Sequence, residues 1–346
     1  MATRRRGSAW DHDWPYADRN ELAHRVLAAA EAAGLRIALL NVCYATGGIG
    51  HALGDRQRRF RAASPESFLE RTEALLESGE SANGLATVGI APHSVRAVPR
   101  DWLPELHAFA RARGLPFHMH VAEQPAEVEE CVAAYGLRPV ELLAEDGLLD
   151  GRFTAIHATH LEDDEIRALA RADTMVCACP TTERDLGDGF LRGRDLLHAG
   201  VDLCLGTDSH TSLDFLAEMR LVEYHERLRR RARVVIAGPA DENGEDAVSV
   251  GPPLLRMATE AGARSLGIDA GAIAAGCRAD LVAVDLDHPS LLGATPETLA
   301  ATLTLSATPG VVRDVWVGGV RRLEDGHHAA ETEAAAAFQR VARRVG

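Results

Sequence analysis

Short apolar runs alternate with amphipathic stretches along most of the chain. The apolar runs have the length and composition of strands, and the stretches between them show helical periodicity. We predict strands at 36–44, 87–92, 116–123, 153–160, 174–180 and 201–208. We predict helices at 20–33, from Ser64-Pro65 onward, and at 102–113, 126–135, 163–172, 192–199, 213–233 and 329–344. Such alternation is typical of a parallel α/β fold, and six strand–helix units are two short of a closed (β/α)8 barrel.

Ionisable residues gather where the predicted strands end. In a β/α barrel the C-terminal ends of the strands meet at one rim, which carries the catalytic groups. A single histidine at such a place is more often structural, but the recurrence on successive strands favours a functional rim. The strand ends read His93, then His120 with Glu123, then His157 with His160, then Thr181-Thr182-Glu183, then Asp208-Ser209-His210.

These residue types suit metal-assisted hydrolysis. His118 and His120 face the same side of their strand because side chains alternate along it. Imidazole and carboxylate groups are good ligands for zinc, and a nearby carboxylate can move protons. Hydrolysis of an amide or amidine needs an activated water, a base, and an acid for the leaving amine. The pattern therefore predicts a metal-dependent hydrolase.

Charge and cysteine content restrict the partners and the compartment. The chain has 37 Lys+Arg against 51 Asp+Glu, a net charge of −14, whereas a nucleic-acid binder needs a basic surface. No apolar run is long enough to span a bilayer, and the N-terminus has the pattern of neither a signal peptide nor an anchor. Four of the six cysteines lie in apolar strand-like runs, where thiols pack as small hydrophobic groups. We expect a cytoplasmic protein without nucleic-acid or membrane partners.

Several motifs resemble those of the amidohydrolase superfamily. They are HMHVAEQ at 118–124, IHATH at 156–160, CPTTE at 179–183 and GTDSH at 206–210. With APHSVR at 91–96 and LGDG at 186–189, the chain resembles the formimidoylglutamate deiminase family of histidine degradation. The resemblance runs from about Trp14 to about Gly326.

The resemblance implies a fold and two domains. Residues 1–264 would form an incomplete metal-dependent-hydrolase (β/α)8 barrel in which strands three to eight of the family are present. Residues 265–346 are similar to the remnant of a small β-sandwich domain, followed by a terminal helix.

The resemblance also implies catalytic roles. His120 and Asp208 would be ligands of one zinc ion, and Asp208 would also act as general base on the attacking water. Glu123 would move protons onto the departing ammonia. His157 would polarise the substrate or hold the tetrahedral intermediate.

Two further residues would bind the substrate. His93 and Arg96 would face it, with Arg96 gripping a carboxylate through a bidentate fork. The implied reaction converts N-formimidoyl-L-glutamate and water to N-formyl-L-glutamate and ammonia. We expect a small-molecule substrate that carries carboxylates, and a homo-oligomer is compatible with the sequence.

The chain departs from the family pattern before its first predicted strand. The family supplies two more zinc ligands from a His-x-His at its first barrel strand, and His12 and His51 lack that spacing. His118-x-His120 is not that pair, because too few predicted strands separate it from Asp208. Without the pair the chain lacks two zinc ligands that are usual in the family, and its own activity is doubtful. The chain would be an internal fragment or carry a misplaced start, be a degenerate relative, or borrow the missing parts from a partner chain.

Three functions therefore stay open. The first is the deiminase, and the second is another amidohydrolase of the aromatic-base deaminase or chlorohydrolase type. Arg96 discriminates between these two, because a carboxylate substrate needs it and a nucleobase has less use for it. The third is a non-catalytic remnant, which would hold no stoichiometric zinc.

Overall fold

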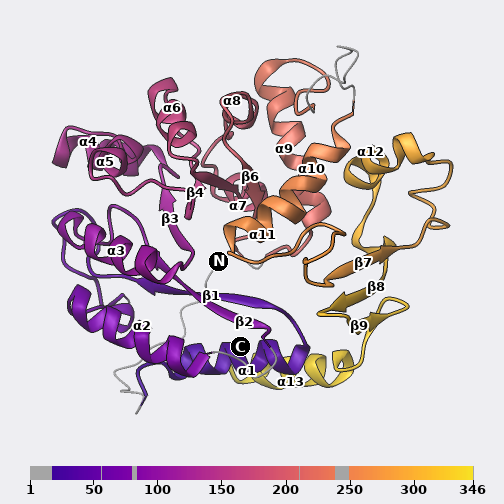
Figure 1. Ribbon diagram of the computed structural model, residues 1–346, viewed down its shortest axis with the longest axis horizontal. Coiled ribbons are helices and arrows are strands. Elements are labelled where there is room, and N and C mark those ends of the chain that lie inside the picture. Colours follow the sequence, from indigo (N-terminus) through magenta and orange to yellow (C-terminus); the bar gives the residue numbers. More distant parts are fainter. Residues whose placement is uncertain (1–17, 56, 80–83, 210, 238–248, 346) are drawn as a thin grey trace.

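A six-stranded sheet forms the centre of the molecule (Figure 1). The computed structural model describes residues 18–55, 57–79, 84–209, 211–237 and 249–345. The strand order is β1-β2-β3-β4-β5-β6, and each neighbouring pair is parallel. The strands are β1 (Ile37–Cys43), β2 (Ala86–Pro92), β3 (Phe117–Val121), β4 (Phe153–His157), β5 (Met175–Ala178) and β6 (Leu203–Leu205). The predicted parallel α/β fold is confirmed. Among the described residues, β1 and β6 do not pair with each other, so closure into a barrel stays a prediction.

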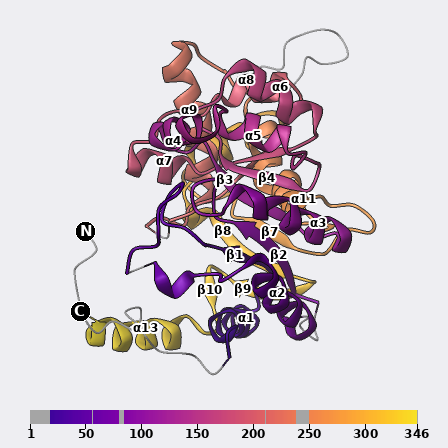
Figure 2. The ribbon, with the colours of Figure 1, turned by 90° about the vertical axis from the view of Figure 1, so that its left-hand side faces the viewer.

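Helices connect the strands and cover the outside of the curved sheet (Figure 1, and Figure 2 from the side). None of the described helices is both long enough and apolar enough to cross a membrane. The helices up to β6 are α1 (Glu21–Ala33), α2 (Pro65–Gly79), α3 (Leu103–Arg113), α4 (Pro125–Tyr135), α5 (Pro139–Glu145), α6 (Asp163–Arg171), α7 (Pro180–Leu186) and α8 (Gly193–His198). Those after β6 are α9 (Phe215–Arg230), α10 (Gly251–Arg256), α11 (Gly262–Ser265), α12 (Pro296–Ser306) and α13 (Glu331–Val345). Helices α5, α10, α11 and α12 were not predicted from the sequence. Residues 180–183 were predicted to end a strand, whereas the structure begins α7 at Pro180.

The two faces of the sheet bury different side chains. Phe117 of β3 packs on Phe153 of β4, with ring centroids 5.5 Å apart, and on His107 of α3. That face therefore lies against the helices and contributes to the main apolar core. Because side chains alternate, His118 and His120 lie on the opposite, inner face, as predicted. The inner face has its own small core of Met175, Cys177, Cys179, Cys204 and Ala261.

The helical segment from α10 to α11 lies along the N-terminal ends of the strands. A π-helical turn, Met257–Ala261, leads from α10 into α11. Arg264 of α11 pairs with Asp173, just before β5, and with Asp202, just before β6. A Cβ on Gly267 would touch Pro116, which precedes β3. This segment therefore covers the end of the sheet opposite to the candidate active site.

The C-terminal region forms a second, antiparallel sheet. Its strand order is β10-β9-β8-β7, and a bidentate pair between Arg36 and Asp280 joins it to the start of β1. Helix α12, which lies between β7 and β8, packs on α9 and α10. The described residues thus contain one sheet here, and the division at residue 264/265 stays a prediction. The strands are β7 (Leu281–Val284), β8 (Val312–Val317), β9 (Val320–Glu324) and β10 (His327–His328).

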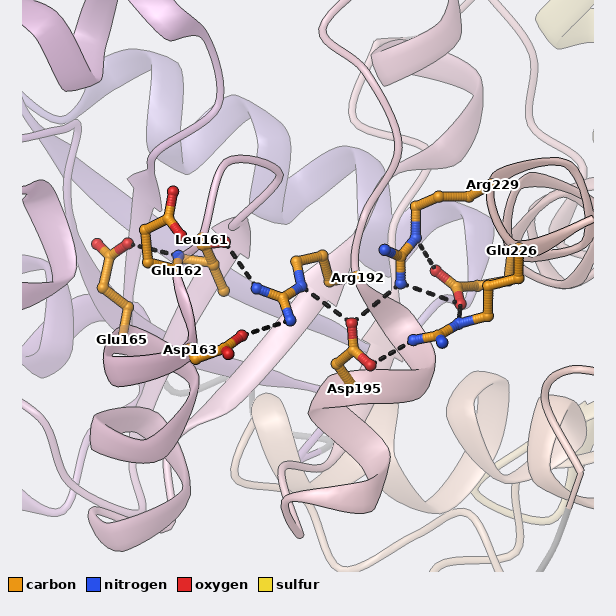
Figure 3. A network of polar contacts seen from close by, with 9 residues as sticks. Leu161, Glu162, Asp163, Glu165, Arg192, Asp195, Glu226 and Arg229 are labelled. Carbon is orange, nitrogen blue, oxygen red and sulfur yellow. Dashed lines mark hydrogen bonds and ion pairs between the residues drawn. The ribbon is translucent and has the colours of Figure 1, made fainter.

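An ionic network joins the helices that flank β4 and β6 (Figure 3). Arg192 donates to Asp195 of α8 at 2.9 Å, to Asp163 of α6, and to the backbone carbonyl of Leu161. Asp195 also accepts hydrogen bonds from Arg229 and Arg230 of α9. One carboxylate is therefore surrounded by three guanidinium groups, and it ties α8 to α9.

We expect Asp195→Ala to lower the free energy of unfolding by about 1.5–3 kcal/mol, because charge-assisted hydrogen bonds to a half-buried group are lost. Burial alone would raise the pKa of Asp195, but the hydrogen bonds from Arg192 and Arg229 hold it below its usual value. The stabilisation is therefore present above the pKa of the unfolded chain, about 3.9, and is lost as the pH falls below it. Urea denaturation of both proteins at several pH values measures the difference.

Asp164→Ala is the matched control, since Asp164 is largely exposed and its one ion pair within the described ranges is with Arg167 of its own helix. It should cost at most about 1 kcal/mol. Equal losses for the two variants would contradict a structural role for the network.

Candidate active site

Four predicted functional groups lie together at the C-terminal edge of the six-stranded sheet. Nε2 of His157, at the end of β4, lies 3.7 Å from Oε1 of Glu123, which follows β3. The same nitrogen lies 3.8 Å from Oδ2 of Asp208, which follows β6. The ring of His120 stacks on that of His157, with centroids 5.6 Å apart. The structure therefore brings together residues that are up to 88 positions apart (208 − 120).

His157 is buried among carboxylates. Its Nδ1 donates to Oε1 of Glu183 at 3.3 Å, and this oxygen also accepts the backbone N–H of Cys179 at 2.8 Å. Nε2 of His157 is buried and has no hydrogen-bond partner among the described residues. Burial alone would lower the pKa of His157, but Glu183, Glu123 and Asp208 raise it above its usual value. Nε2 of the imidazole thus faces the carboxylates of Glu123 and Asp208, which favour its protonated form.

The backbone adopts a strained conformation at and beside these residues. Four non-glycine residues here have φ in the left-handed region: Ala122 (50°), His157 (70°), Ala158 (50°) and Asp208 (50°). Few non-glycine residues adopt this conformation, and it is concentrated at functional sites. At His157 it breaks the alternation along β4, so that the ring stacks on His120 of the inner face.

His120 has the hydrogen bonding of a metal ligand. Its Nδ1 donates to the backbone carbonyl of His93 at 2.7 Å, which leaves the lone pair of Nε2 free. The His93 ring lies against His120 on one side and the edge of Tyr44 on the other. Burial, aided by the charges of His120 and Arg96, lowers the pKa of His93 to about 4. His93 is therefore a neutral hydrogen-bonding group at pH 7.

Arg96 borders a cavity whose wall contains none of the four residues of the cluster. The cavity has a volume of about 600 Å3, and its wall includes Thr46, Ile49 and Tyr135. Nε of Arg96 is buried and has no hydrogen-bond partner among the described residues. Its guanidinium lies 3.9 Å from Oε2 of Glu127, which is longer than a hydrogen bond. Arg96 therefore keeps most of its donors available for an anion.

Other residues of the predicted rim have different partners. Nε2 of His118 donates to the backbone carbonyl of Ser265 at 2.7 Å, so it is not free to act as an additional ligand. Nε2 of His160 donates to the carbonyl of Asp188. Thr181 belongs to α7 and donates its hydroxyl to Glu218. His12 and His210 lie outside the described residues.

Two buried carboxylates were given no role by the sequence. Glu183 was noted only as a polar residue near a strand end, and the structure places it on His157. Glu127 was not noted at all, although it occupies the first turn of α4 directly after the motif with Glu123. An acidic residue in the first turn of a helix is usually explained by its favourable interaction with the helix dipole. The sequence therefore provided no reason to place Glu127 beside the site.

The described residues fit part of a zinc site. His120 and Asp208 are suitable donors, and the partnerless Nε2 of His157 lies beside them. No group of three or more His, Cys, Asp or Glu side chains within the described ranges is arranged to hold a metal ion. A zinc site needs three or four protein ligands, so these residues do not complete one by themselves.

Comparison with known sequences gives two kinds of deaminating enzyme. Formimidoylglutamate deiminase from Pseudomonas aeruginosa is 38% identical over 330 residues, which are 94% of this chain and 70% of that protein. A 5-methylthioadenosine/S-adenosylhomocysteine deaminase from Natronomonas pharaonis is 34% identical over 87% of this chain and 64% of its own length. The chain thus spans about two thirds of the length of these relatives.

Solved structures agree with the sequences. An amidohydrolase from Brucella melitensis has a TM-score of 0.88 and 36% identity, over 97% of this chain and 73% of that one. An adenosine deaminase from Xanthomonas campestris with bound zinc has a TM-score of 0.78 and 26% identity, over 94% and 69% of the two chains. Residues 13–322 match the amidohydrolase family. The chain therefore belongs to the amidohydrolase family, whose members similar to it include formimidoylglutamate deiminase.

Proposed function

We propose that this chain carries the active site of a formimidoylglutamate deiminase. The reaction adds water to N-formimidoyl-L-glutamate and gives N-formyl-L-glutamate and ammonia. The observation that carries the proposal is Arg96, whose buried Nε has no hydrogen-bond partner among the described residues. The charge of Arg96 acts on His93, and the ring of His93 packs against that of His120. A guanidinium in this state suits a substrate carboxylate, and the identity with the Pseudomonas deiminase supports the assignment.

The side chains divide the proton transfers between them. Asp208 takes a proton from the attacking water, and Glu123 delivers a proton to the nitrogen that leaves as ammonia. Nε2 of His157, between these carboxylates, donates to the charge that develops on the substrate. His93, neutral at pH 7, and Arg96 hold the rest of the substrate.

Zinc is part of the proposal. His120 and Asp208 would hold it, together with ligands that are not among the described residues. A bound zinc ion lowers the pKa of water and polarises a C=N or C=O bond. Zinc is bound in the related adenosine deaminase structure, which supports this choice of metal.

The cysteines and the net charge support a proposal for the compartment and the class of partner. All six cysteines are free thiols, which suits a reducing, cytoplasmic compartment. A net charge of −14 suits small-molecule rather than nucleic-acid partners. That the chain forms a homo-oligomer stays a prediction.

A deaminase of an aromatic base is the second candidate, because relatives of that kind share the fold. Arg96 favours the deiminase, since a nucleobase carries no carboxylate for it.

The purified full chain, supplied with zinc, should release ammonia from N-formimidoyl-L-glutamate and not from S-adenosylhomocysteine or adenosine. Chelation of the metal should abolish release, because water activation depends on it. Metal analysis and an ammonia assay, carried out together, check both statements. Release from the nucleosides alone would favour the second candidate. The absence of both zinc and turnover would leave a non-catalytic relative.

Arg96→Met should weaken binding of N-formyl-L-glutamate by about 10- to 100-fold, since hydrogen bonds between charged groups are lost. Isothermal titration calorimetry measures the dissociation constant. Arg100→Met is the matched control: Arg100 borders the same cavity, but Asp146 and Glu145 already hold its guanidinium. Its effect should stay below about threefold. Equal losses would contradict a specific role for Arg96.

Glu183→Gln should lower the pKa of His157 in the metal-free chain, because a hydrogen-bonded negative charge is removed. An NMR titration of the His157 ring measures the shift. A raised histidine pKa stabilises the fold fully below the unfolded value, about 6.5, and this contribution is lost as the pH rises through the folded pKa. The wild type should therefore have a larger free energy of unfolding than the variant at low pH, and this difference should shrink as the pH rises.

Glu218→Gln removes another buried carboxylate, one that hydrogen-bonds Thr181 and not His157. It should leave the His157 titration nearly unchanged. A similar shift in both variants would point to a general effect of buried charge.

A further inference from the structure

Glu127 occupies the first turn of α4 and is completely buried. Its Oε1 accepts the backbone N–H of Ala122 at 3.0 Å, and its Oε2 accepts that of Glu123 at 3.2 Å. Both oxygens therefore serve the short link between β3 and α4. That link carries the Glu123 carboxylate, to which we assign the proton transfer.

The link needs such an anchor because of its conformation. Ala122 has φ of 50°, in the left-handed region that a non-glycine residue rarely adopts. The N–H groups of Ala122 and Glu123 both point at one side chain, so both lose their partner if that side chain changes. A glutamine could accept from only one of them with its oxygen, and its NH2 group would face the other N–H. The site is therefore built for a carboxylate.

The same carboxylate also faces the substrate-binding arginine. Oε2 of Glu127 lies 3.9 Å from the guanidinium of Arg96. Burial raises the pKa of Glu127 to about 7, while Arg96 and the two backbone N–H groups act in the opposite direction. One buried group thus adjoins both the residue proposed for carboxylate binding and the residue proposed for proton transfer.

We infer that Glu127 is a positioning residue, which fixes Glu123 against Nε2 of His157 by holding its backbone. The inference rests on the proposed function for the role of Glu123. The geometric part, the anchoring of the β3–α4 link, stands independently of which substrate is used.

Glu165 provides a matched control within the same chain. It is buried, lies in the first turn of α6, accepts the backbone N–H of Glu162 at 2.9 Å and pairs with Arg138. Glu127 and Glu165 therefore share burial, a backbone acceptor role and an arginine neighbour. Glu165 contacts none of the proposed catalytic residues in the described part of the chain.

The first measurement is amide hydrogen exchange in the full chain, which requires no turnover. Glu127→Gln should speed exchange at Ala122 and Glu123 by about tenfold or more, because local opening becomes easier. Exchange in strand β4 should stay unchanged, and Glu165→Gln should leave Ala122 and Glu123 unaffected. Unchanged exchange at both amides in Glu127→Gln would overturn the inference.

The second measurement is a double-mutant cycle with N-formimidoyl-L-glutamate and the zinc-supplied chain. Glu127→Gln should lower kcat by about tenfold or more while KM changes less than about threefold, because the lost interaction matters in the proton-transfer step. The pair Glu123→Gln with Glu127→Gln should be no slower than Glu123→Gln alone. Glu165→Gln should keep the wild-type kcat and KM.

The outcomes separate this inference from the proposed function. Losses that multiply in the double variant would show that Glu127 does not act through Glu123, and the inference would be wrong. If the wild-type chain binds zinc and releases no ammonia from this substrate, the proposed function fails. The exchange result then decides by itself whether Glu127 anchors the link.

Discussion

Parallel hydrogen bonding between six successive strands brings their C-terminal ends to one edge of the sheet, and the proposed chemistry depends on that edge. A parallel sheet cannot place two strand ends at opposite edges, so residues far apart in sequence become neighbours. For this reason Nε2 of His157 lies 3.7 Å from the carboxylate of Glu123 and 3.8 Å from that of Asp208. Helix α11 covers the N-terminal ends of the strands at the opposite edge. The polar groups of the candidate site lie at the C-terminal ends.

Buried carboxylates hold the loops that leave the strands. Glu127 accepts two backbone N–H groups after β3, Glu183 accepts one after β5, and Glu218 accepts that of Thr181. A buried charge is costly unless it is hydrogen-bonded, so each of these groups constrains the backbone around it. The left-handed residue Ala122 is held in this way by Glu127, and it positions Glu123, which follows it in the chain.

The sequence predicted the strand order and most members of the site, because apolar runs and strand-end histidines are local signals. It predicted strand lengths less well: the run at 201–208 contains only Leu203–Leu205 as a strand. At His157, a left-handed turn ends β4 earlier than its apolar character suggests. The partners of Glu127 and Glu183 were not predicted, because they depend on the orientation of helices relative to strands. The local pattern of apolar and polar residues does not predict such contacts.

The bidentate pair between Arg36 and Asp280 joins residues 244 positions apart. During synthesis, β1 leaves the ribosome long before the C-terminal sheet does, so this pair cannot form until that sheet has been made. Contacts of such long sequence separation form slowly, since the loop between them must close first. The junction between β1 and the C-terminal sheet is therefore expected to be among the last tertiary contacts to form when the chain folds.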